Sequence, residues 1–267
     1  MFYKIKLHFM KFLKIFYLSF FCLSLEAVIV DTGHANVSLV KFESLEGDRS
    51  KTLLGIKMDM QENWHTYWKN PGDSGGPIKV KWSHDNNISI SKIYWPTPTL
   101  IPYEPLMTYG YKNFVIFPFE ITNSNNKNSY IEAKIDFLIC DDICVPEKAL
   151  IKTNLDEINT DPSLNDWFLK VPDQILPVKA SVDSEHISIR FSSPFNVSSA
   201  IFFVDEQDIV EHAENQKLSK EENNYLLSIK KVDYLESFEN LSGVLSINNN
   251  ESFIIDAEIE NVTQNSF

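Results

Sequence analysis

Apolar and polar residues alternate along most of the chain, which is the pattern of β-strands that bury one face and expose the other. The longest clean run has apolar residues at every second position from Ile131 to Ile139 and leads directly into Cys140. Other alternating segments or short apolar runs span residues 37–41, 54–60, 78–82, 187–191, 200–204, 227–229, 244–247 and 253–259. The sequence therefore predicts an all-β protein.

The alternation is interrupted between the two halves of the chain. There, Asp161 followed by a proline predicts the start of a short helix, and Pro172 predicts its end. We therefore predict a β-sandwich at residues 31–155, a linker with a short helix at 156–177, and a second, smaller β-sandwich domain at 178–262. The second domain holds no cysteine and no evident cluster of catalytic side chains, so a packing or docking role is expected for it.

The first residues have the pattern of a secretion signal. Four lysines up to Lys14 make a basic start, and an apolar run follows from Ile15 to Leu25. That run has the length of a signal-peptide core, and it is short for a membrane-spanning helix, which needs about 20 apolar residues. Ala27 offers a cleavage position, so residues 1–27 are predicted to be a signal peptide, with an uncleaved membrane anchor as the alternative. An exported protein is therefore expected, which would meet an oxidising compartment.

Composition narrows the function classes. The chain has 267 residues, of which 43% are hydrophobic and 23% are charged, which excludes a disordered acidic tail or a collagen. With 24 Lys+Arg against 37 Asp+Glu, the net charge is −13, so no nucleic-acid partner is expected. Three cysteines are too few for a disulfide framework, and after removal of the signal peptide only Cys140 and Cys144 remain.

One short motif resembles the sequence around the nucleophile of chymotrypsin-like serine proteases. Residues 72–77 read Gly-Asp-Ser-Gly-Gly-Pro, and His65 lies shortly before them. A catalytic triad needs its nucleophile, base and acid within hydrogen-bonding reach, and chymotrypsin-like enzymes take their histidine and serine from two separate barrels. Here His65 and Ser74 lie in one short segment, and no complete barrel fits before them. We interpret the motif as a tight turn between two strands.

The cysteine pair is the main candidate for chemistry. A fully extended chain from Cys140 to Cys144 would separate the two Cα atoms by about 13 Å, whereas a disulfide needs roughly 4.4–6.8 Å. The chain must therefore turn back between the two residues if they pair. A ring of this size removes little entropy from the unfolded chain, worth about 2 kcal/mol. The spacing leaves two interpretations open, a structural staple of a hairpin end and a redox pair at a strand terminus.

Side chains near the pair add further alternatives. Asp141 and Asp142 disfavour nearby thiolates and should raise the thiol pKa values, which suits a pair that a partner's thiolate attacks. The two thiols together with His65 or His34 could bind copper or zinc. The sequence holds no CxxC or HxxxH motif that would complete such a ligand set.

Three motifs that follow one another resemble one family. They are residues 64–75, the Tyr-Gly-Tyr triplet at 109–111, and residues 140–147. Together they resemble the N-terminal periplasmic domain of DsbD-type thiol:disulfide interchange proteins, and in particular the ScsB-like branch, which has three residues between its cysteines. The resemblance covers residues 35–155, and the rest of the chain fits the second β-domain of ScsB-like proteins by general pattern.

The resemblance implies an immunoglobulin-like β-sandwich in which Cys140 and Cys144 shuttle between disulfide and dithiol and are the catalytic residues. In the family, a cap loop shields the pair until a partner docks, and residues 103–111 match that loop. The expected residues of the cap and the site rim are Glu104, Met107, Tyr109, Tyr111, His65 and Tyr67. As plain sequence, the aromatic residues could equally fill the end of the sandwich, and Glu104 could be a solvated carboxylate.

The resemblance also implies partners and a pathway for electrons. Electrons arrive from a membrane-embedded donor and leave to periplasmic thioredoxin-like proteins, and no metal, flavin or nucleotide cofactor is expected. Cytochrome c maturation and copper tolerance are processes that the family suggests. The best-known members fuse this domain to a membrane carrier and a thioredoxin domain, so here a separate polypeptide is expected to supply the electrons. Two alternatives remain, an immunoglobulin-like binding module with a structural disulfide and a copper-binding protein.

Overall fold

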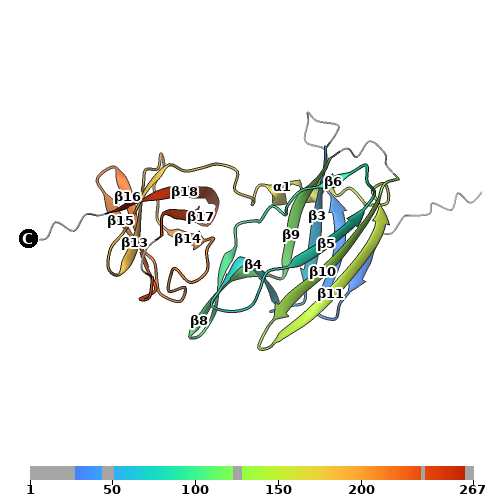
Figure 1. Cartoon of the computed structure of the whole chain (residues 1–267), viewed down its shortest axis with the longest axis horizontal. Helices are drawn as coiled ribbons and strands as arrows, with labels where there is room; N and C mark the ends of the chain where they lie inside the picture. Colours follow the sequence, from blue (N-terminus) through green and yellow to red (C-terminus); the bar gives the residue numbers. More distant parts are fainter. Residues whose placement is uncertain (1–27, 44–50, 123–127, 236–237, 262–267) are drawn as a thin grey trace, which may run out of the picture.

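The computed structural model describes residues 28–43, 51–122, 128–235 and 238–261. The signal peptide predicted at residues 1–27 lies outside them. Within the described residues the chain is almost entirely β, in two domains that lie side by side along the long axis, with the short helix α1 (Asn165–Phe168) between them (Figure 1). The prediction of an all-β protein is confirmed.

The first domain is a sandwich of two antiparallel sheets. One has the strand order β1-β2-β3-β9-β6, with β1 at Ile29–Asp31, β2 at Ala35–Lys41, β3 at Lys51–Met60, β9 at Phe114–Thr122 and β6 at Ser89–Ile90. The other has the order β11-β10-β4-β8-β7, with β11 at Cys144–Asn154, β10 at Tyr130–Cys140, β4 at His65–Gly72, β8 at Leu106–Lys112 and β7 at Thr99–Tyr103. A further strand, β5 (Lys79–His84), pairs with β10.

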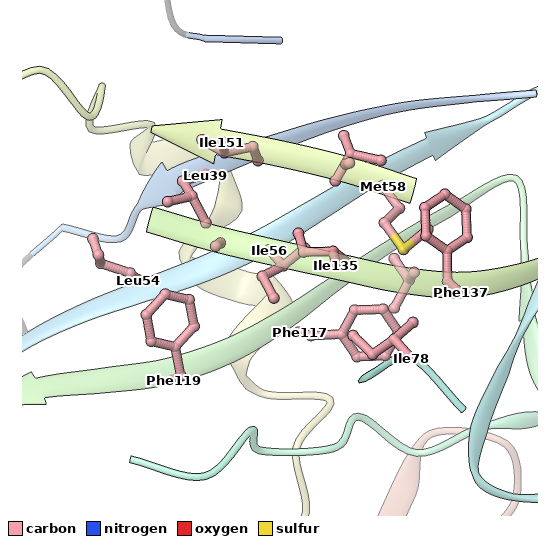
Figure 2. Packing of buried hydrophobic residues seen from close by; sticks show 14 of the residues in the cluster. Leu39, Leu54, Ile56, Met58, Ile78, Phe117, Phe119, Ile135, Phe137 and Ile151 are labelled. Carbon is pink, nitrogen blue, oxygen red and sulfur yellow. The ribbon is translucent and has the colours of Figure 1, made fainter. Parts of the chain in front are cut away.

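The core of the sandwich lies between these two sheets. The alternation from Ile131 to Ile139 places its apolar side chains inward on β10, where they are buried. They pack against inward side chains of β3 and β9, including Ile56 and Phe117 (Figure 2). Burial of such a side chain contributes about 1.5–3 kcal/mol, so the alternating pattern itself brings the sheets together. Because the whole inward face of β10 is packed, the end of the strand at Cys140 has a fixed position.

The second domain is built around a seven-stranded sheet. Its order is β14-β17-β18-β12-β13-β16-β15, with β14 at Ala200–Val204, β17 at Asn240–Ile247, β18 at Glu251–Asn261, β12 at Val178–Val182, β13 at His186–Phe191, β16 at Asn224–Lys230 and β15 at Lys217–Glu221. Its own apolar core includes Ile189, Phe202 and Leu245. The predicted fold class, an immunoglobulin-like β-sandwich followed by a second β-domain, is confirmed.

The connection between the domains holds the predicted short helix. Asp161 accepts a hydrogen bond from a backbone N–H of the first turn at 3.1 Å and caps a 3-10 turn, η1 (Pro162–Leu164), which continues into α1. The helix ends before Pro172, as that proline predicts. Trp167 anchors α1 on the first domain, because its indole N–H donates to the backbone oxygen of Ile116 at 2.9 Å. The connection is therefore packed against the sandwich.

Candidate functional site

A disulfide closes the tip of a β-hairpin. β10 ends at Cys140, β11 begins at Cys144, and these residues are the last paired positions of the hairpin. The backbone N–H of Asp141 donates to the backbone oxygen of Ile143 at 3.2 Å, which turns the chain between the cysteines. The two Cα atoms are 4.1 Å apart and the sulfur atoms are bonded. The chain reversal that pairing requires is confirmed.

The two cysteines differ in exposure. The side chain of Cys140 is buried, with 1% of its surface exposed, whereas Cys144 is exposed. Beside it in the turn, Ile143 is 67% exposed, and Asp141 and Asp142 are exposed as well. A thiolate that approaches from solvent therefore reaches the Cys144 end of the bond, across a surface with one apolar and two acidic side chains.

A buried tyrosine contacts both sulfur atoms. The hydroxyl of Tyr67 donates to Sγ of Cys140 at 2.6 Å and lies 3.2 Å from Sγ of Cys144. Tyr67 belongs to β4, the neighbour of β10, and only 1% of its side chain is exposed. Burial raises the pKa of Tyr67 to about 12, because the phenolate would lose its hydration. At neutral pH the residue keeps its proton and presents a hydrogen-bond donor to the disulfide.

The turn after β4 supports the ring of Tyr67. Gly75 has φ +90°, and a Cβ at this position would lie 2.1 Å from Cε1 and Cζ of Tyr67. The ring thus packs directly on the glycine backbone, where a side chain would collide with it. Ser74, which a protease would use as its nucleophile, shares a hydrogen bond of 2.9 Å with the Thr108 hydroxyl. The Gly-Asp-Ser-Gly motif is therefore a turn, as interpreted from the sequence.

His65 is the residue of β4 that pairs with Cys140 in the sheet. Its ring packs edge-on against that of Tyr67, with 5.4 Å between the centroids. Burial lowers the pKa of His65, the Lys112 ammonium lowers it further, and the Asp141 carboxylate opposes both effects. The imidazole is therefore held in its neutral form next to the buried end of the disulfide.

The expected cap residues lie on the hairpin of β7 and β8. Glu104 and Pro105 form its tip, joined by a cis peptide bond, and Glu104 is exposed. The hydroxyl of Tyr103 donates to the backbone oxygen of Asp142 at 3.4 Å, so the hairpin reaches the turn between the cysteines. Met107 is half-buried on the returning strand. This contact brings the tip of the hairpin next to the disulfide.

Tyr109 and Tyr111, also expected at the rim, have their described contacts with other parts of the protein. Tyr109 is buried against the second domain, with its ring centroid 5.0 Å from that of Phe203 and 4.9 Å from that of His212. Tyr111 is buried in the sandwich, where its hydroxyl donates to the backbone oxygen of Pro96 at 2.7 Å. β8 therefore connects the tip of the cap hairpin with the core and with the second domain.

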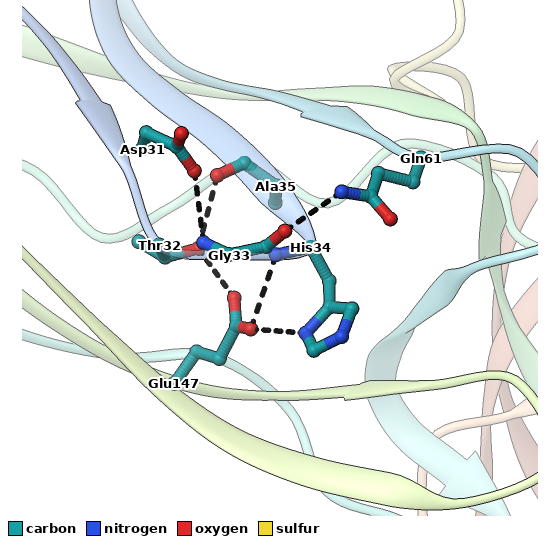
Figure 3. A network of polar contacts seen from close by, with 7 residues as sticks. All are labelled: Asp31, Thr32, Gly33, His34, Ala35, Gln61 and Glu147. Atoms are coloured by element: carbon teal, nitrogen blue, oxygen red, sulfur yellow. Dashed lines mark hydrogen bonds and ion pairs between the residues drawn. The ribbon is translucent and has the colours of Figure 1, made fainter.

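A buried carboxylate anchors the start of β11, as Figure 3 shows. Glu147 is 7% exposed, and its oxygens accept hydrogen bonds from the Thr32 hydroxyl and from the backbone N–H of His34 at 3.2 Å. The Nδ1 atom of His34 lies 2.6 Å from the same carboxylate, and the imidazole stacks on Trp64 with 3.8 Å between the centroids. These contacts fasten the strand that begins at Cys144 to the turn between β1 and β2.

Glu147 was not among the site residues that the sequence suggested, although a signal for it exists. It occupies an inward position on a strand whose next inward residues are Ala149 and Ile151. An acidic residue on such a face must find polar partners, because burial of an unpaired carboxylate is costly. The partners themselves, Thr32 and His34, lie 115 and 113 positions away, so the local pattern does not reveal them.

Two further kinds of feature, a cluster of metal ligands and a membrane-spanning helix, are absent from the described part of the chain. In these segments, no group of three or more His, Cys, Asp or Glu side chains is arranged to hold a metal ion. The ligand set considered for copper or zinc, the two cysteines with His65 or His34, therefore does not form such a group. No helix among the described residues is long and apolar enough to cross a membrane.

Fold and site together define a class of protein, a β-sandwich that presents a disulfide at an accessible hairpin end and carries a second β-domain. Residues 36–155 match the family described as the N-terminal domain of thiol:disulfide interchange protein DsbD. The match covers the first domain, and the resemblance drawn from the three motifs is confirmed.

A solved structure extends the likeness to both domains. The N-terminal periplasmic domain of ScsB from Proteus mirabilis has a similar fold, with a TM-score of 0.67 over 86% of this chain and 96% of that chain. The two sequences are 17% identical, so the likeness concerns the fold. No curated protein matches the chain by sequence.

Proposed function

We propose that the protein is a periplasmic thiol:disulfide interchange protein that relays electrons through Cys140 and Cys144. The electrons come from a membrane-embedded donor and pass to thioredoxin-like or other periplasmic clients. The observation that carries this proposal is the asymmetry of the cysteine pair, in which Cys144 is exposed and Cys140 is buried, with the Tyr67 hydroxyl in contact with both sulfur atoms. A disulfide that served only as a staple would need neither an exposed cysteine nor a donor aimed at the bond.

Reduction starts at the exposed sulfur. A thiolate of the donor attacks Sγ of Cys144, the Cys140–Cys144 bond breaks, and a mixed disulfide between the donor and Cys144 forms. Cys140 leaves as a thiolate. The second thiolate of the donor then attacks the donor's own sulfur in the mixed disulfide and releases Cys144. Two electrons have then passed to the pair, and two protons from solvent complete the dithiol. The reverse sequence of steps delivers the two electrons to an oxidised client.

Tyr67 assists the step in which Cys140 leaves. Its hydroxyl already points at the sulfur that becomes negatively charged. A hydrogen bond to a charged group contributes about 1.5–3 kcal/mol, and one between neutral groups contributes less. The interaction therefore stabilises the transition state more than the resting disulfide, which is the condition for catalysis.

The rim around Cys144 supplies the surface on which a partner docks. Tyr103 and Leu106 on the cap hairpin and Ile143 in the cysteine turn are all exposed, although each has a large apolar side chain. Apolar and aromatic side chains of this kind are typical of the centre of an interface. A thioredoxin-like partner would bury this rim and bring its thiolate to Cys144, and Glu104 lies at the edge of the same surface.

Trapping of mixed disulfides tests the proposal. Cys140→Ser leaves the exposed Cys144 unable to release a bound partner, so the variant should accumulate a mixed disulfide with a thioredoxin-like protein of the periplasm. Cys144→Ser is the matched control, because it leaves only the buried sulfur and should trap far less. Equal trapping by both variants, or none by either, would contradict the proposal.

The redox potential separates a relay from a staple. Structural disulfides of secreted proteins have potentials below about −300 mV, whereas exchangeable ones are less reducing. We expect a midpoint above that limit in a glutathione or dithiothreitol titration. A midpoint well below it would favour the alternative, an immunoglobulin-like binding module in which the disulfide is structural.

A further inference from the structure

The second domain docks on the strand that carries Tyr67. Directly after this residue on β4, the ring of Trp68 packs edge-on against Phe203, with 6.2 Å between the centroids. The ammonium of Lys69 lies 2.7 Å from the carboxylate of Asp205. Phe203 lies near the end of β14, an edge strand of the second domain, and Asp205 directly follows this strand. The two domains therefore meet at the strand that supplies a hydrogen bond to the disulfide.

Asn70 joins the two domains through its side-chain amide. Its Nδ2 donates to the backbone oxygens of Val204 and Glu206 at 2.9 Å each, and its Oδ1 accepts from the backbone N–H of Gly72 at 3.0 Å. The side chain is fully buried. A buried polar group that loses its partner is penalised, so the junction is held in one geometry.

The segment that contains Asn70 is an irregular, bulge-like interruption of the ladder between β4 and β8. β4 and β8 pair at Tyr67 and Gly110 and next at Gly72 and Thr108, so the register shifts between these positions. The intervening residues of β4 leave the ladder, and three of them, Trp68, Lys69 and Asn70, contact the second domain. In a bulge the ladder of backbone hydrogen bonds is disrupted, so contacts of the side chains decide its shape.

The end of the bulge is connected to the redox site in two ways. Asp73 exchanges two hydrogen bonds with Met107 on the cap hairpin, from its own N–H to the Met107 oxygen at 3.0 Å and from the Met107 N–H to its carboxylate at 2.8 Å. Gly75 supports the ring of Tyr67. A displacement of the bulge is therefore transmitted both to the cap hairpin and to the tyrosine.

We propose that the second domain is part of the redox site, and that Asn70 is the positioning residue through which this domain places the Tyr67 hydroxyl against the disulfide. The inference rests on the proposed function, because it assigns the second domain a role in the same sulfur exchange. The domain then acts on the chemistry itself, beyond the packing or docking role that the sequence suggested.

A double-mutant cycle with dithiothreitol as the reductant tests the proposal on the full chain. Asn70→Asp keeps the acceptor for the Gly72 N–H and removes both donors to the second domain, whereas Tyr67→Phe removes the hydroxyl. We expect Asn70→Asp to slow reduction of the disulfide at least threefold and to raise the pKa of the Cys140 thiol in the reduced protein. Both effects should vanish in the Tyr67→Phe background. Equal slowing in both backgrounds, or none in either, would overturn the proposal.

Gln216→Glu is the matched control for this cycle. Gln216 forms hydrogen bonds with the backbone of the same edge strand, β14. Its Nε2 donates to the backbone oxygen of Phe202 at 2.9 Å, and its Oε1 accepts from the Phe202 N–H at 2.8 Å. The substitution removes an amide donor and adds a carboxylate, as Asn70→Asp does, but within the second domain. It should leave the rate of reduction unchanged. If Gln216→Glu slows reduction as much as Asn70→Asp does, the slowing is caused by loosening of β14 and not by loss of the hydrogen bonds from Asn70 to the second domain. That result would overturn the role assigned to Asn70.

A second variant covers the case in which Asn70→Asp does not fold. Phe203→Leu keeps an apolar side chain but removes the aromatic packing on Trp68 and Tyr109. We expect reduction at least twofold slower than in the wild type, again only when Tyr67 is present, and a wild-type rate would overturn the proposal. Reduction by dithiothreitol requires no biological partner. The result of this test can therefore be interpreted even if the trapping experiment and the measured redox potential exclude an electron relay.

Discussion

The hydroxyl of Tyr67 donates a hydrogen bond to Sγ of Cys140, the buried sulfur, across 73 positions of the sequence. The contact exists because β4 lies beside β10, with His65 paired to Cys140 at the end of the hairpin. The same hydroxyl lies 3.2 Å from Sγ of Cys144. One side chain thus contacts both ends of the bond that would break, and the sulfur it donates to is the one that would leave.

Removal of this hydroxyl should slow the exchange. We expect Tyr67→Phe to reduce the rate of disulfide reduction by dithiothreitol about five- to tenfold, since a hydrogen bond to a charged group contributes about 1–1.5 kcal/mol more than the neutral one that the resting disulfide also loses. The rate is measured by acid quench at timed intervals, followed by alkylation and mass spectrometry. Tyr111→Phe is the control, because it also removes a buried tyrosine hydroxyl, one that bonds to Pro96, and it should leave the rate unchanged. Equal rates for Tyr67→Phe and the wild type would contradict the role of the hydroxyl.

The difference in exposure should appear as a difference in reactivity. In the reduced protein, we expect iodoacetamide to alkylate Cys144 at least tenfold faster than Cys140, because Cys144 is exposed and Cys140 is buried. Peptide mass spectrometry after short exposures measures both rates. In guanidinium chloride the two rates should become similar, which is the internal control. Similar rates in the folded protein would show that the asymmetry does not persist after reduction.

The carboxylate of Glu147 should contribute to the stability of the first domain. Glu147→Gln removes the negative charge that accepts hydrogen bonds from Thr32 and His34, so we expect a loss of roughly 2 kcal/mol in the free energy of unfolding. Urea denaturation of the oxidised protein measures it. Lys148→Gln, at the exposed neighbour whose ion pair with Asp136 lies on the surface, should change stability by less than about 1 kcal/mol. A loss in Glu147→Gln no larger than in this control would contradict the anchoring role.

The histidines should make stability depend on pH. The folded state lowers the pKa of His65 below its usual 6.5, so below that pH the unfolded chain binds more protons than the folded one. The free energy of unfolding should therefore fall as the pH decreases from 7.5 to 5.5. His212, whose pKa is lowered chiefly by burial, contributes in the same direction. His65→Gln should lose less stability than the wild type over this interval, and an equal loss in both would contradict the assignment.

Much of the fold could be predicted from local patterns. The alternation from Ile131 to Ile139 defines which face of β10 is buried, because side chains of a strand point alternately to its two faces. Asp161 followed by proline predicted the short helix, since a capping side chain and a residue with fixed φ act within one turn. The three motifs predicted a family, and the model of that family matches residues 36–155, which contain all three motifs.

The composition of the site was predicted less completely. Tyr67 was expected at the rim from a resemblance, but its contact with both sulfur atoms follows from the packing of β4 beside β10. Tyr109 was expected at the rim as well, and its described contacts are with the second domain. Asn70 was not singled out, because its partners Val204 and Glu206 lie 134 and 136 positions further along the chain.

By itself, the sequence determined the strand pattern, the pairing potential of two nearby cysteines and the class of chemistry they can perform. These properties depend on residues within a few positions of one another, where side-chain direction and turn formation follow from local geometry. Only the tertiary structure decided that Cys144 is exposed and Cys140 is buried, and that Asn70 links β4 to the second domain. Burial and long-range hydrogen bonds depend on how whole sheets and domains pack, and a local pattern holds no information about that packing.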